Sequence, residues 1–222
     1  MRNKGDNLYF RVFISHASSQ RSLATDISTA FEDDGIRGFV AHSDIEPTSE
    51  WQVVIERELH DCNALVAIFS PDFHQSRWTD QEVGIAIGRE VPVVAVRYGL
   101  DPYGFLAKYQ AYAALGKAPP VIAKDVADLL MSVKDRNATA WRLTQALIQR
   151  LARSKSTQDA ERVTARLEQV TEYNKWLADL LQEIVETTPQ LRGITGLSER
   201  IGKLIEKFDK PRSSNNGVQP TK

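Results

Sequence analysis

The sequence is poor in cysteine and has no long apolar run. A single cysteine, Cys62, excludes an internal disulfide and any metal site built on paired cysteines. Its place between an amphipathic and an apolar stretch predicts a small buried side chain. The N-terminal residues lack the apolar core of a signal peptide, and no run approaches the roughly 20 apolar residues that span a membrane. We therefore expect a cytoplasmic protein with no membrane segment.

The chain also lacks an excess of charge of either sign. It carries 28 Lys and Arg against 29 Asp and Glu, so its formal net charge is −1. Binding nucleic acid or an anionic membrane through a broad surface needs a clear basic excess, so neither partner is predicted. With 222 residues, of which 42% are hydrophobic, the chain can bury a core of ordinary size. Its length fits one domain with an accessory segment, or one large domain.

Several motifs of nucleotide-binding and hydrolytic proteins are missing. The sequence has no Walker loop, no GxGxxG, no HExxH and no GxSxG. A receiver-type phosphoacceptor needs a carboxylate at the end of a central strand, whereas the relevant apolar runs end in Ser15 and in Phe69 followed by Ser70. No cluster of histidines or carboxylates predicts a metal site. These absences argue against each of those classes and against a resident metal.

The first part of the chain alternates short apolar runs with amphipathic stretches. The runs with strand character are Tyr9–Ser15, Gly38–Ala41, Ala64–Phe69 and Val91–Arg97. The stretches with helical periodicity are Gln20–Asp34, Glu50–Asp61 and Asp80–Glu90. Nearly continuous apolar strands separated by helices predict an α/β domain whose parallel sheet is covered on both faces. Lys108–Leu115 is expected to add an edge strand and Pro119–Val133 a last helix, giving a doubly wound, flavodoxin-like domain over residues 1–134.

After Lys134 the pattern becomes helical. Helices are predicted over Asn137–Arg153, Asp159–Glu186 and Ser198–Phe208, which gives a C-terminal helical region over residues 135–210. The remaining residues, 211–222, are polar and predict a disordered tail.

The predicted middle helix carries a heptad seam. Its members are Val163, Leu167, Val170, Asn174, Leu177, Leu181 and Ile184. Such a seam packs either within the chain's own bundle or against another chain, and a single buried Asn fixes register and strand number. The apolar face is wider than a two-stranded seam, which favours a bundle. So few helices are small for independent stability, and we expect a homo-oligomer, a dimer, held through this region.

A doubly wound sheet binds ligands beyond the carboxyl ends of its strands, where the strand order reverses. In the flavodoxin-like order this point lies between the first and third strands. The segments available there are Ser15–Ser19 and Ser70–Glu82, and the loop His42–Ser49 is placed to close over them. We expect the functional site among these three segments.

The same segments resemble the boxes of TIR (Toll/interleukin-1 receptor) domains. FISHAS at residues 13–18 resembles the first box, HSDIEPTSEW at 42–51 the BB loop, and SRWTDQE at 76–82 the S-x-W-x-x-x-E box. The resemblance covers residues 9–115 and is closest in kind to the NAD+-consuming TIR domains of bacterial antiphage defence, such as the Thoeris type. It implies cleavage of the bond between nicotinamide and ribose, and self-association with other TIR domains.

The resemblance also implies roles for individual residues. Glu82 matches the essential glutamate, and Trp51 matches an aromatic residue that stacks on nicotinamide. His16 and Ala17 match residues that line the pocket. Two further substrate-binding residues are predicted from the same boxes, Trp78 and Ser49.

The chemistry of this cleavage needs few groups. Nicotinamide leaves NAD+ as a neutral molecule, so no general acid has to protonate it. The requirement is to stabilise an oxocarbenium-like ribosyl cation, which one nearby carboxylate does electrostatically. An indole holds the pyridinium ring with a cation–π contribution of about 0.5–2 kcal/mol. NAD+ is then a substrate and no cofactor is predicted; the product is ADP-ribose or a cyclic isomer, which the sequence does not distinguish.

Simpler interpretations exist for each residue. Thr79 and Glu82 have the spacing of a capping box, in which Glu82 only binds a backbone N–H. Trp78 shares a helix face with Glu82 and is placed to pack beneath it. A protein partner is an alternative cover for Trp51, and a backbone carbonyl is an alternative partner for His16. The alternative function is a non-catalytic scaffold that binds other TIR domains, which needs neither Glu82 nor Trp51.

Overall fold

The structure is a computed structural model that describes residues 9–41, 51–136 and 138–210. The predicted loop His42–Ser49 and the predicted tail 211–222 lie outside this range. Five parallel strands form one sheet in the order β2-β1-β3-β4-β5. The strands are β1 (Phe10–Ser15), β2 (Ile36–Phe39), β3 (Ala64–Phe69), β4 (Val93–Arg97) and β5 (Tyr112–Ala113). The order reverses between β1 and β3, which confirms the flavodoxin-like α/β prediction.

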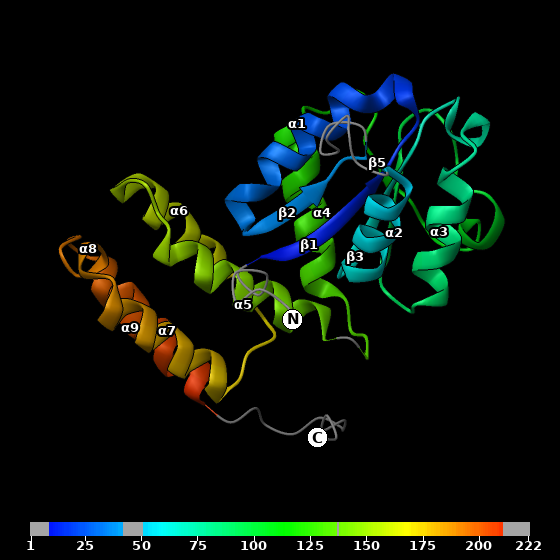
Figure 1. The fold of residues 1–222 in the computed structure, drawn as a ribbon. Coiled ribbons are helices and arrows are strands. Elements are labelled where there is room, and N and C mark those ends of the chain that lie inside the picture. Colours follow the sequence, from blue (N-terminus) through cyan, green and yellow to red (C-terminus); the bar gives the residue numbers. More distant parts are fainter. Residues whose placement is uncertain (1–8, 42–50, 137, 211–222) are drawn as a thin grey trace.

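Helices cover both faces of this sheet (Figure 1). The elements on one face are α1 (Arg21–Phe31) and α4 (Pro119–Ser132), and those on the other are α2 (Trp51–Asp61) and α3 (Thr79–Gly88). Short 3-10 turns connect them: η2 (Ser18–Gln20), η3 (Glu32–Asp34), η4 (Phe73–Gln75) and η5 (Gly104–Leu106).

The central strand β3 shows why the strands read as continuous apolar runs. All six of its residues are buried. Val66 and Ile68 pack under α1 and α4, whereas Leu65 and Phe69 pack under α2 and α3. Because successive side chains of a strand point to opposite faces, a strand between two helix layers needs apolar residues at every position.

The predicted boundaries are wrong at the edges of the sheet. The second strand begins at Ile36, not at Gly38, and ends at Phe39. Gly35 adopts a left-handed φ of +71° that closes the preceding turn and lets the chain extend immediately. The fifth strand, predicted over Lys108–Leu115, is reduced to Tyr112–Ala113, because these are the positions that reach the end of β4.

Within residues 138–210, five helices follow the α/β domain and form a bundle. They are α5 (Thr139–Ala152), α6 (Thr157–Glu168), α7 (Lys175–Thr187), α8 (Pro189–Arg192) and α9 (Leu197–Asp209). In Figure 1, α7 and α9 lie side by side and α6 lies between them and the α/β domain. Within the described residues, no helix is both long and apolar enough to cross a membrane.

The predicted continuous helix over Asp159–Glu186 is wrong. The chain leaves helical conformation after α6 and resumes it at Lys175. Asn174 is the N-cap of α7, and its side-chain Oδ1 accepts a hydrogen bond of 3.0 Å from the backbone N–H of Leu177. Asn is among the strongest N-cap residues, so its capping preference decides here against a place in a seam. Asn174 is exposed, not buried between helices.

The apolar residues of the predicted seam pack inside the chain itself. The set Val163, Leu167, Val170, Leu177, Leu181 and Ile184 shares one buried core with residues of α5 and α9, among them Leu147, Leu151, Leu204 and Phe208. The structure therefore supports the intramolecular alternative for this seam and removes the reason for which we expected it to join two chains. Self-association by other surfaces stays a prediction.

The helical region is anchored to the α/β domain by buried charges. Arg166 of α6 donates from Nε to Asp34 of η3 at 2.5 Å and from Nη1 to Asp128 of α4 at 2.6 Å. Arg150 of α5 binds both carboxylate oxygens of Asp159 and donates from Nε to a backbone carbonyl of η3. Burial raises the pKa of Asp34, and the neighbouring Arg166 opposes that rise.

Apolar packing crosses the same boundary. Leu143 and Ala146 of α5 belong to the core beneath α1 and α4. The apolar core thus continues across the change of composition near Lys134. The α/β domain and the helical region bury surface against each other.

Candidate active site

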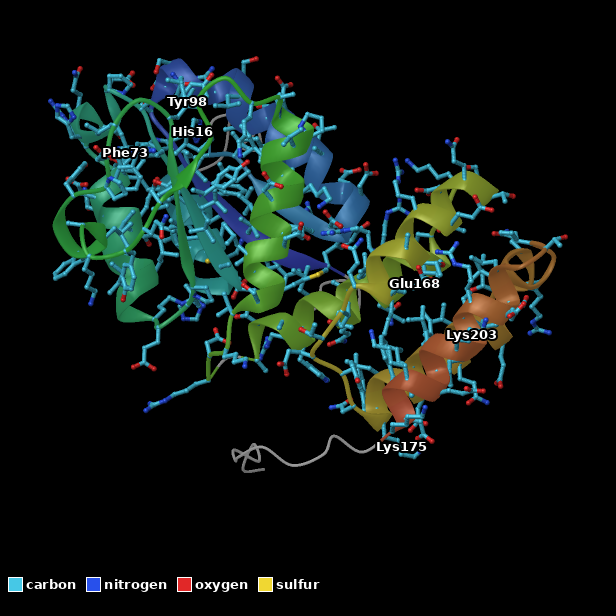
Figure 2. The ribbon with its side chains drawn as sticks, turned by 180° about the vertical axis from the view of Figure 1, so that it is seen from behind. His16, Phe73, Tyr98, Glu168, Lys175 and Lys203 are labelled. Carbon is cyan, nitrogen blue, oxygen red and sulfur yellow. The ribbon has the colours of Figure 1, made fainter. Side chains whose placement is uncertain are left out.

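The carboxyl ends of β1, β3 and β4 meet at one end of the α/β domain. Figure 2 shows His16, Phe73 and Tyr98, which follow these strands, at the end of that domain away from the helices that carry Glu168, Lys175 and Lys203. The predicted segments Ser15–Ser19 and Ser70–Glu82 therefore converge, as expected for a doubly wound sheet.

Glu82 points from the first turn of α3 to the end of β1. The hydroxyl of Ser15 donates a hydrogen bond of 2.6 Å to Oε2 of Glu82. Ser15 is fully buried and Glu82 is only 5% exposed. This is the single hydrogen bond of the Glu82 carboxyl group within the described residues. A buried carboxyl group with one hydroxyl donor keeps unused acceptor capacity for a ligand.

Burial raises the pKa of Glu82 from a usual 4.5 to about 7, and the hydrogen bond from Ser15 acts in the opposite direction. Desolvation disfavours the charged form of a carboxyl group, so the site holds Glu82 close to its midpoint at neutral pH. Such a group is poised to become fully ionised when a cation comes near. Strong perturbation of this kind marks candidate functional sites.

The capping-box interpretation of Glu82 is wrong. Trp78 occupies the N-cap position of α3 and forms no side-chain cap. The hydroxyl of Thr79 donates to the carbonyl of Phe73 at 2.8 Å, away from the backbone N–H groups of the helix. The carboxyl group of Glu82 binds Ser15 instead of a backbone N–H. The buried position of Glu82 therefore has no capping explanation.

Two predicted substrate-binding residues, Trp51 and Trp78, touch each other. Their ring centroids are 5.0 Å apart and the rings meet edge to face at 81°. Trp51 begins α2 and is 44% exposed, whereas Trp78 is half-buried one turn before Glu82. Edge-to-face contacts of this kind are favourable for aromatic pairs. The pair thus presents an exposed indole, supported from behind, near the turn that carries Glu82.

The remaining predicted site residues have mixed outcomes. His16 is buried, and its Nδ1 donates to the carbonyl of Ile14 at 2.9 Å, which is the simpler interpretation given above. Ala17 is buried and its carbonyl accepts from the backbone of Gln20. Ser49 lies outside the described residues. Contacts of His16, Ala17 and Ser49 with a substrate stay predictions.

A second carboxylate, not foreseen as a site residue, ties together the loops after β1 and β3. Asp72 accepts from Ser19 at 2.5 Å and from Ser70 at 2.6 Å. These hydrogen bonds lower the pKa of Asp72. A Ser two residues before an Asp is a common local pairing, and this signal was present in the sequence. The link across the strand-order reversal was not, because Ser19 and Asp72 are distant in the chain.

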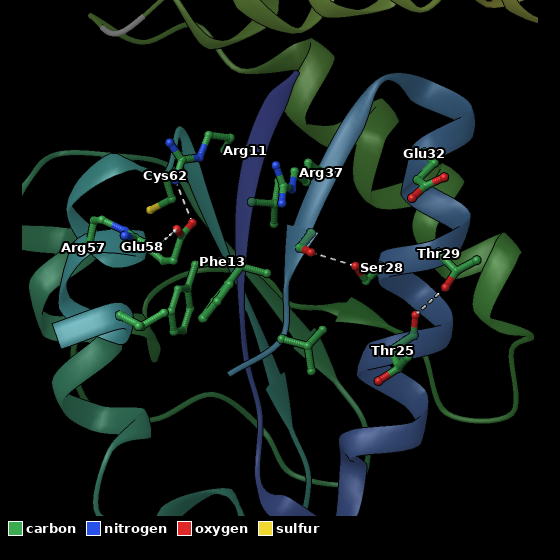
Figure 3. Close-up of a pocket in the computed structure, with 15 residues that line it drawn as sticks. Arg11, Phe13, Thr25, Ser28, Thr29, Glu32, Arg37, Arg57, Glu58 and Cys62 are labelled. Carbon is green, nitrogen blue, oxygen red and sulfur yellow. Dashed lines mark hydrogen bonds and ion pairs between the residues drawn. The ribbon is translucent and has the colours of Figure 1, made fainter. Parts of the chain in front are cut away.

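The hollow drawn in Figure 3 lies elsewhere, along β2 between α1 and α2. Its volume is ≈ 510 Å³, and none of the predicted site residues lines it. Arg11 on its wall pairs with Glu58 at 2.7 Å. Over residues 9–41, 51–136 and 138–210, no group of three His, Cys, Asp or Glu side chains is placed to hold a metal ion.

Comparisons with known proteins identify the family of this chain. A family model described as TIR domain matches residues 12–128, more than half of the chain. A probable 2′ cyclic ADP-D-ribose synthase, BdTIR of Brachypodium distachyon, is 24% identical over 104 residues, which covers 46% of each protein. The chain thus spans about half the length of this curated relative.

Among solved structures, the TIR domain of the Toll-related receptor TRR-2 from Hydra magnipapillata aligns with a TM-score of 0.39 and 22% identity. That alignment covers 46% of this chain and 80% of the other. The family match over residues 12–128 contains all of the described site residues, from Ser15 to Glu82. The chain belongs to the TIR domain family.

Proposed function

We propose that this protein cleaves the bond between nicotinamide and ribose in NAD+, with Glu82 facing the ribose. The observation that carries the proposal is the buried carboxyl group of Glu82, which among the described residues is bound by Ser15 alone. It lies one turn after Trp78, whose ring contacts the exposed indole of Trp51. A scaffold does not require a buried carboxyl group with a pKa raised by burial, whereas stabilisation of a cation requires a carboxyl group. The relative from Brachypodium, named a probable 2′ cyclic ADP-D-ribose synthase, supports the same class of reaction.

The proposed step breaks the bond between C1′ of ribose and the pyridinium nitrogen. The bonding electron pair goes to the ring nitrogen, so nicotinamide leaves as a neutral molecule. The positive charge moves to C1′ and the ring oxygen of ribose, where ionised Glu82 stabilises it. Because Glu82 is buried, this attraction is stronger than it would be in water.

A nucleophile then completes the reaction at C1′. Attack by water with loss of one proton gives ADP-ribose, and attack by a hydroxyl or adenine nitrogen of the same molecule gives a cyclic isomer. Both routes use the same cation. The name of the Brachypodium relative favours the cyclic route at the level of the family.

The direct test is incubation of the full chain with NAD+ over a range of protein concentrations, with nicotinamide and the second product separated and quantified. We expect release of nicotinamide together with ADP-ribose or a cyclic isomer. Binding of NAD+ is followed in parallel by ligand-observed NMR. A chain that neither binds NAD+ nor releases nicotinamide at any concentration would favour the scaffold alternative.

The Trp pair gives a further prediction. Trp51→Ala should raise KM for NAD+ by about 10-fold, since a stacked, partly desolvated cation–π contact contributes up to about 2 kcal/mol. Its effect on stability should be small because the side chain is 44% exposed. Steady-state kinetics and thermal unfolding measure the two effects.

The chain offers a matched control for Trp51. Trp176 on α7 is 47% exposed and also touches a second tryptophan, Trp141, with ring centroids 5.0 Å apart. Trp176→Ala should change stability by a similar amount and leave KM unchanged. Equal effects of the two substitutions on KM would remove Trp51 from the substrate site.

We also propose a setting for the activity, which the sequence alone suggests. The resemblance of the three boxes to those of defence proteins supports a role in bacterial antiphage defence, and we propose that the protein acts in the cytoplasm. Self-association with other TIR domains is part of the same proposal. Each of these stays a prediction.

A further inference from the structure

Ser15 is placed by the sheet, not by a loop. It is the last residue of β1 and pairs with Ala67 of β3. This pairing in the interior of the sheet fixes the backbone of Ser15. Phe13, two residues earlier, packs under α2 and α3, and alternation along the strand turns Ser15 to the same face. The side chain of Ser15 therefore lies on the face of the sheet that α2 and α3 cover, where it meets Glu82 in the first turn of α3.

Among the residues that the structure describes, the hydroxyl of Ser15 has one hydrogen-bond partner, the carboxyl group of Glu82. A distance of 2.6 Å is that of a charge-assisted hydrogen bond from a hydroxyl to a carboxylate. Both groups are at least nine-tenths buried, so water does not readily replace the donor if it is removed. Oε2 is engaged by Ser15, and Oε1 has no hydrogen bond from the part of the chain that the structure describes.

No charged side chain from the described elements perturbs Glu82. The pKa of Glu82 is raised by burial, and the Ser15 hydroxyl is the one influence that lowers it. The nearest titratable neighbour along β1, His16, directs its Nδ1 to the carbonyl of Ile14 instead. Ser15 is thus the group through which the fold favours the ionised form of Glu82.

We propose that Ser15 is a positioning residue for the reaction: its hydroxyl holds Oε2 of Glu82 and leaves Oε1 directed to the ribosyl cation. Ser15 acts through Glu82 and does not touch NAD+. This inference rests on the proposed function, because it assigns Ser15 a part in the same step. It adds that the orientation of the catalytic group is set by the end of β1.

The decisive variant is Ser15→Ala, which removes the donor and little volume. We expect kcat to fall by about 10-fold at neutral pH, the effect of losing one hydrogen bond of ordinary strength, with KM for NAD+ nearly unchanged. The acid limb of the pH profile of kcat/KM should move to higher pH, because the remaining influence on the pKa of Glu82 is burial. Ser15→Thr keeps the hydroxyl and should restore most of the rate.

A second measurement does not depend on activity. The pKa of Glu82 is followed by NMR of carbon-labelled carboxyl groups, with its resonance assigned by its loss in Glu82→Gln. Starting from about 7 in the wild-type chain, it should rise in Ser15→Ala. Ser15→Cys retains approximate shape with a weaker donor and should give an intermediate value, which also serves if the alanine variant does not fold.

Ser28→Ala is the control. Ser28 on α1 is partly buried and donates to the carbonyl of Gly38 at 2.8 Å, and α1 covers the face of the sheet opposite to α3. The Ser28→Ala variant should lose a hydrogen bond of similar length, and it should change neither kcat nor the pKa of Glu82.

The outcomes separate the two ideas. If the wild-type chain releases no nicotinamide, the proposed function fails, while the NMR titration still tests whether Ser15 controls Glu82. If the wild-type chain is active and Ser15→Ala keeps its kcat, its pH profile and the pKa of Glu82, the positioning role of Ser15 is overturned and the proposed function stands.

Discussion

Glu82→Gln is expected to lower the rate of NAD+ cleavage by at least about 100-fold, the usual effect of removing a group that stabilises transition-state charge electrostatically. Gln keeps the size of the side chain and an oxygen that can accept from Ser15, so the local geometry should persist. What is lost is the negative charge beside the ribosyl cation. Nicotinamide release under saturating NAD+ measures the effect.

The same substitution should make the protein more stable at alkaline pH. The pKa of Glu82 is raised from 4.5 to about 7 by burial. A raised pKa means that the folded chain binds the proton more tightly than the unfolded chain does. The stability associated with this group is therefore full below the unfolded pKa and is lost as pH rises through the folded pKa. Above pH 7 the ionised carboxylate destabilises the fold by about 3 kcal/mol.

Gln carries no charge at any pH, so it escapes this loss. Thermal unfolding at about pH 5 and about pH 8.5 should show little difference between Glu82→Gln and wild type at the lower pH and a clear gain at the higher one. Glu56→Gln on the exposed side of α2 is the control, and it should change neither activity nor the pH dependence of stability. A Glu82→Gln protein that turns over NAD+ normally would remove Glu82 from the reaction.

The parts of the fold that follow from local pattern were predicted from the sequence. β3 was predicted at its observed bounds, because a strand between two helix layers is apolar at every position and reads differently from a helix. The alternation of strands and helices predicted a doubly wound, flavodoxin-like sheet. In that strand order, the reversal lies between the first and third strands. Glu82 was identified because the box SRWTDQE at residues 76–82 resembles that of TIR domains, and the strand-order reversal placed this box at the expected ligand site.

The contact between Ser15 and Glu82 was outside the reach of the sequence pattern. The two residues are 67 positions apart, and their meeting depends on how far β1 extends and how α3 is rotated. The spacing of Thr79 and Glu82 suggested a cap, but tertiary contacts turned both side chains inward. The contact between Trp51 and Trp78 was missed for the same reason.

Asn174 shows a different limit of prediction from sequence periodicity. Heptad spacing and N-cap preference both fit an Asn within an apolar periodic run, and spacing alone does not decide between them. Helical conformation is interrupted before this residue, because α7 changes direction and packs on α5 and α9. A periodic pattern indicates which residues are buried, and it was right about Leu177 and Leu181, but it did not indicate that two helices share the seam.

Gly35→Ala is expected to have the largest effect on stability. Gly35 has a φ of +71°, and a Cβ added there would lie 2.7 Å from the carbonyl oxygen of Ala146 and 2.9 Å from its carbonyl carbon. Both atoms belong to the backbone of α5, which cannot rotate away as a side chain does. Left-handed conformation costs an alanine about 1 kcal/mol or somewhat more, and the steric overlap adds about 1–3 kcal/mol. We expect a total loss of about 2–5 kcal/mol.

Gly116→Ala separates the two contributions. Gly116 has a φ of +81°, so alanine there experiences the same backbone strain, but nothing lies within 4 Å of the added Cβ. Urea unfolding of both variants should give a loss of about 1 kcal/mol for Gly116→Ala and a clearly larger one for Gly35→Ala. The difference measures how firmly α5 is held against the turn before β2, beside the buried pairs that Arg150 and Arg166 form with η3. If the two losses are equal, α5 moves aside without cost, and the helical region is not an integral part of the α/β fold.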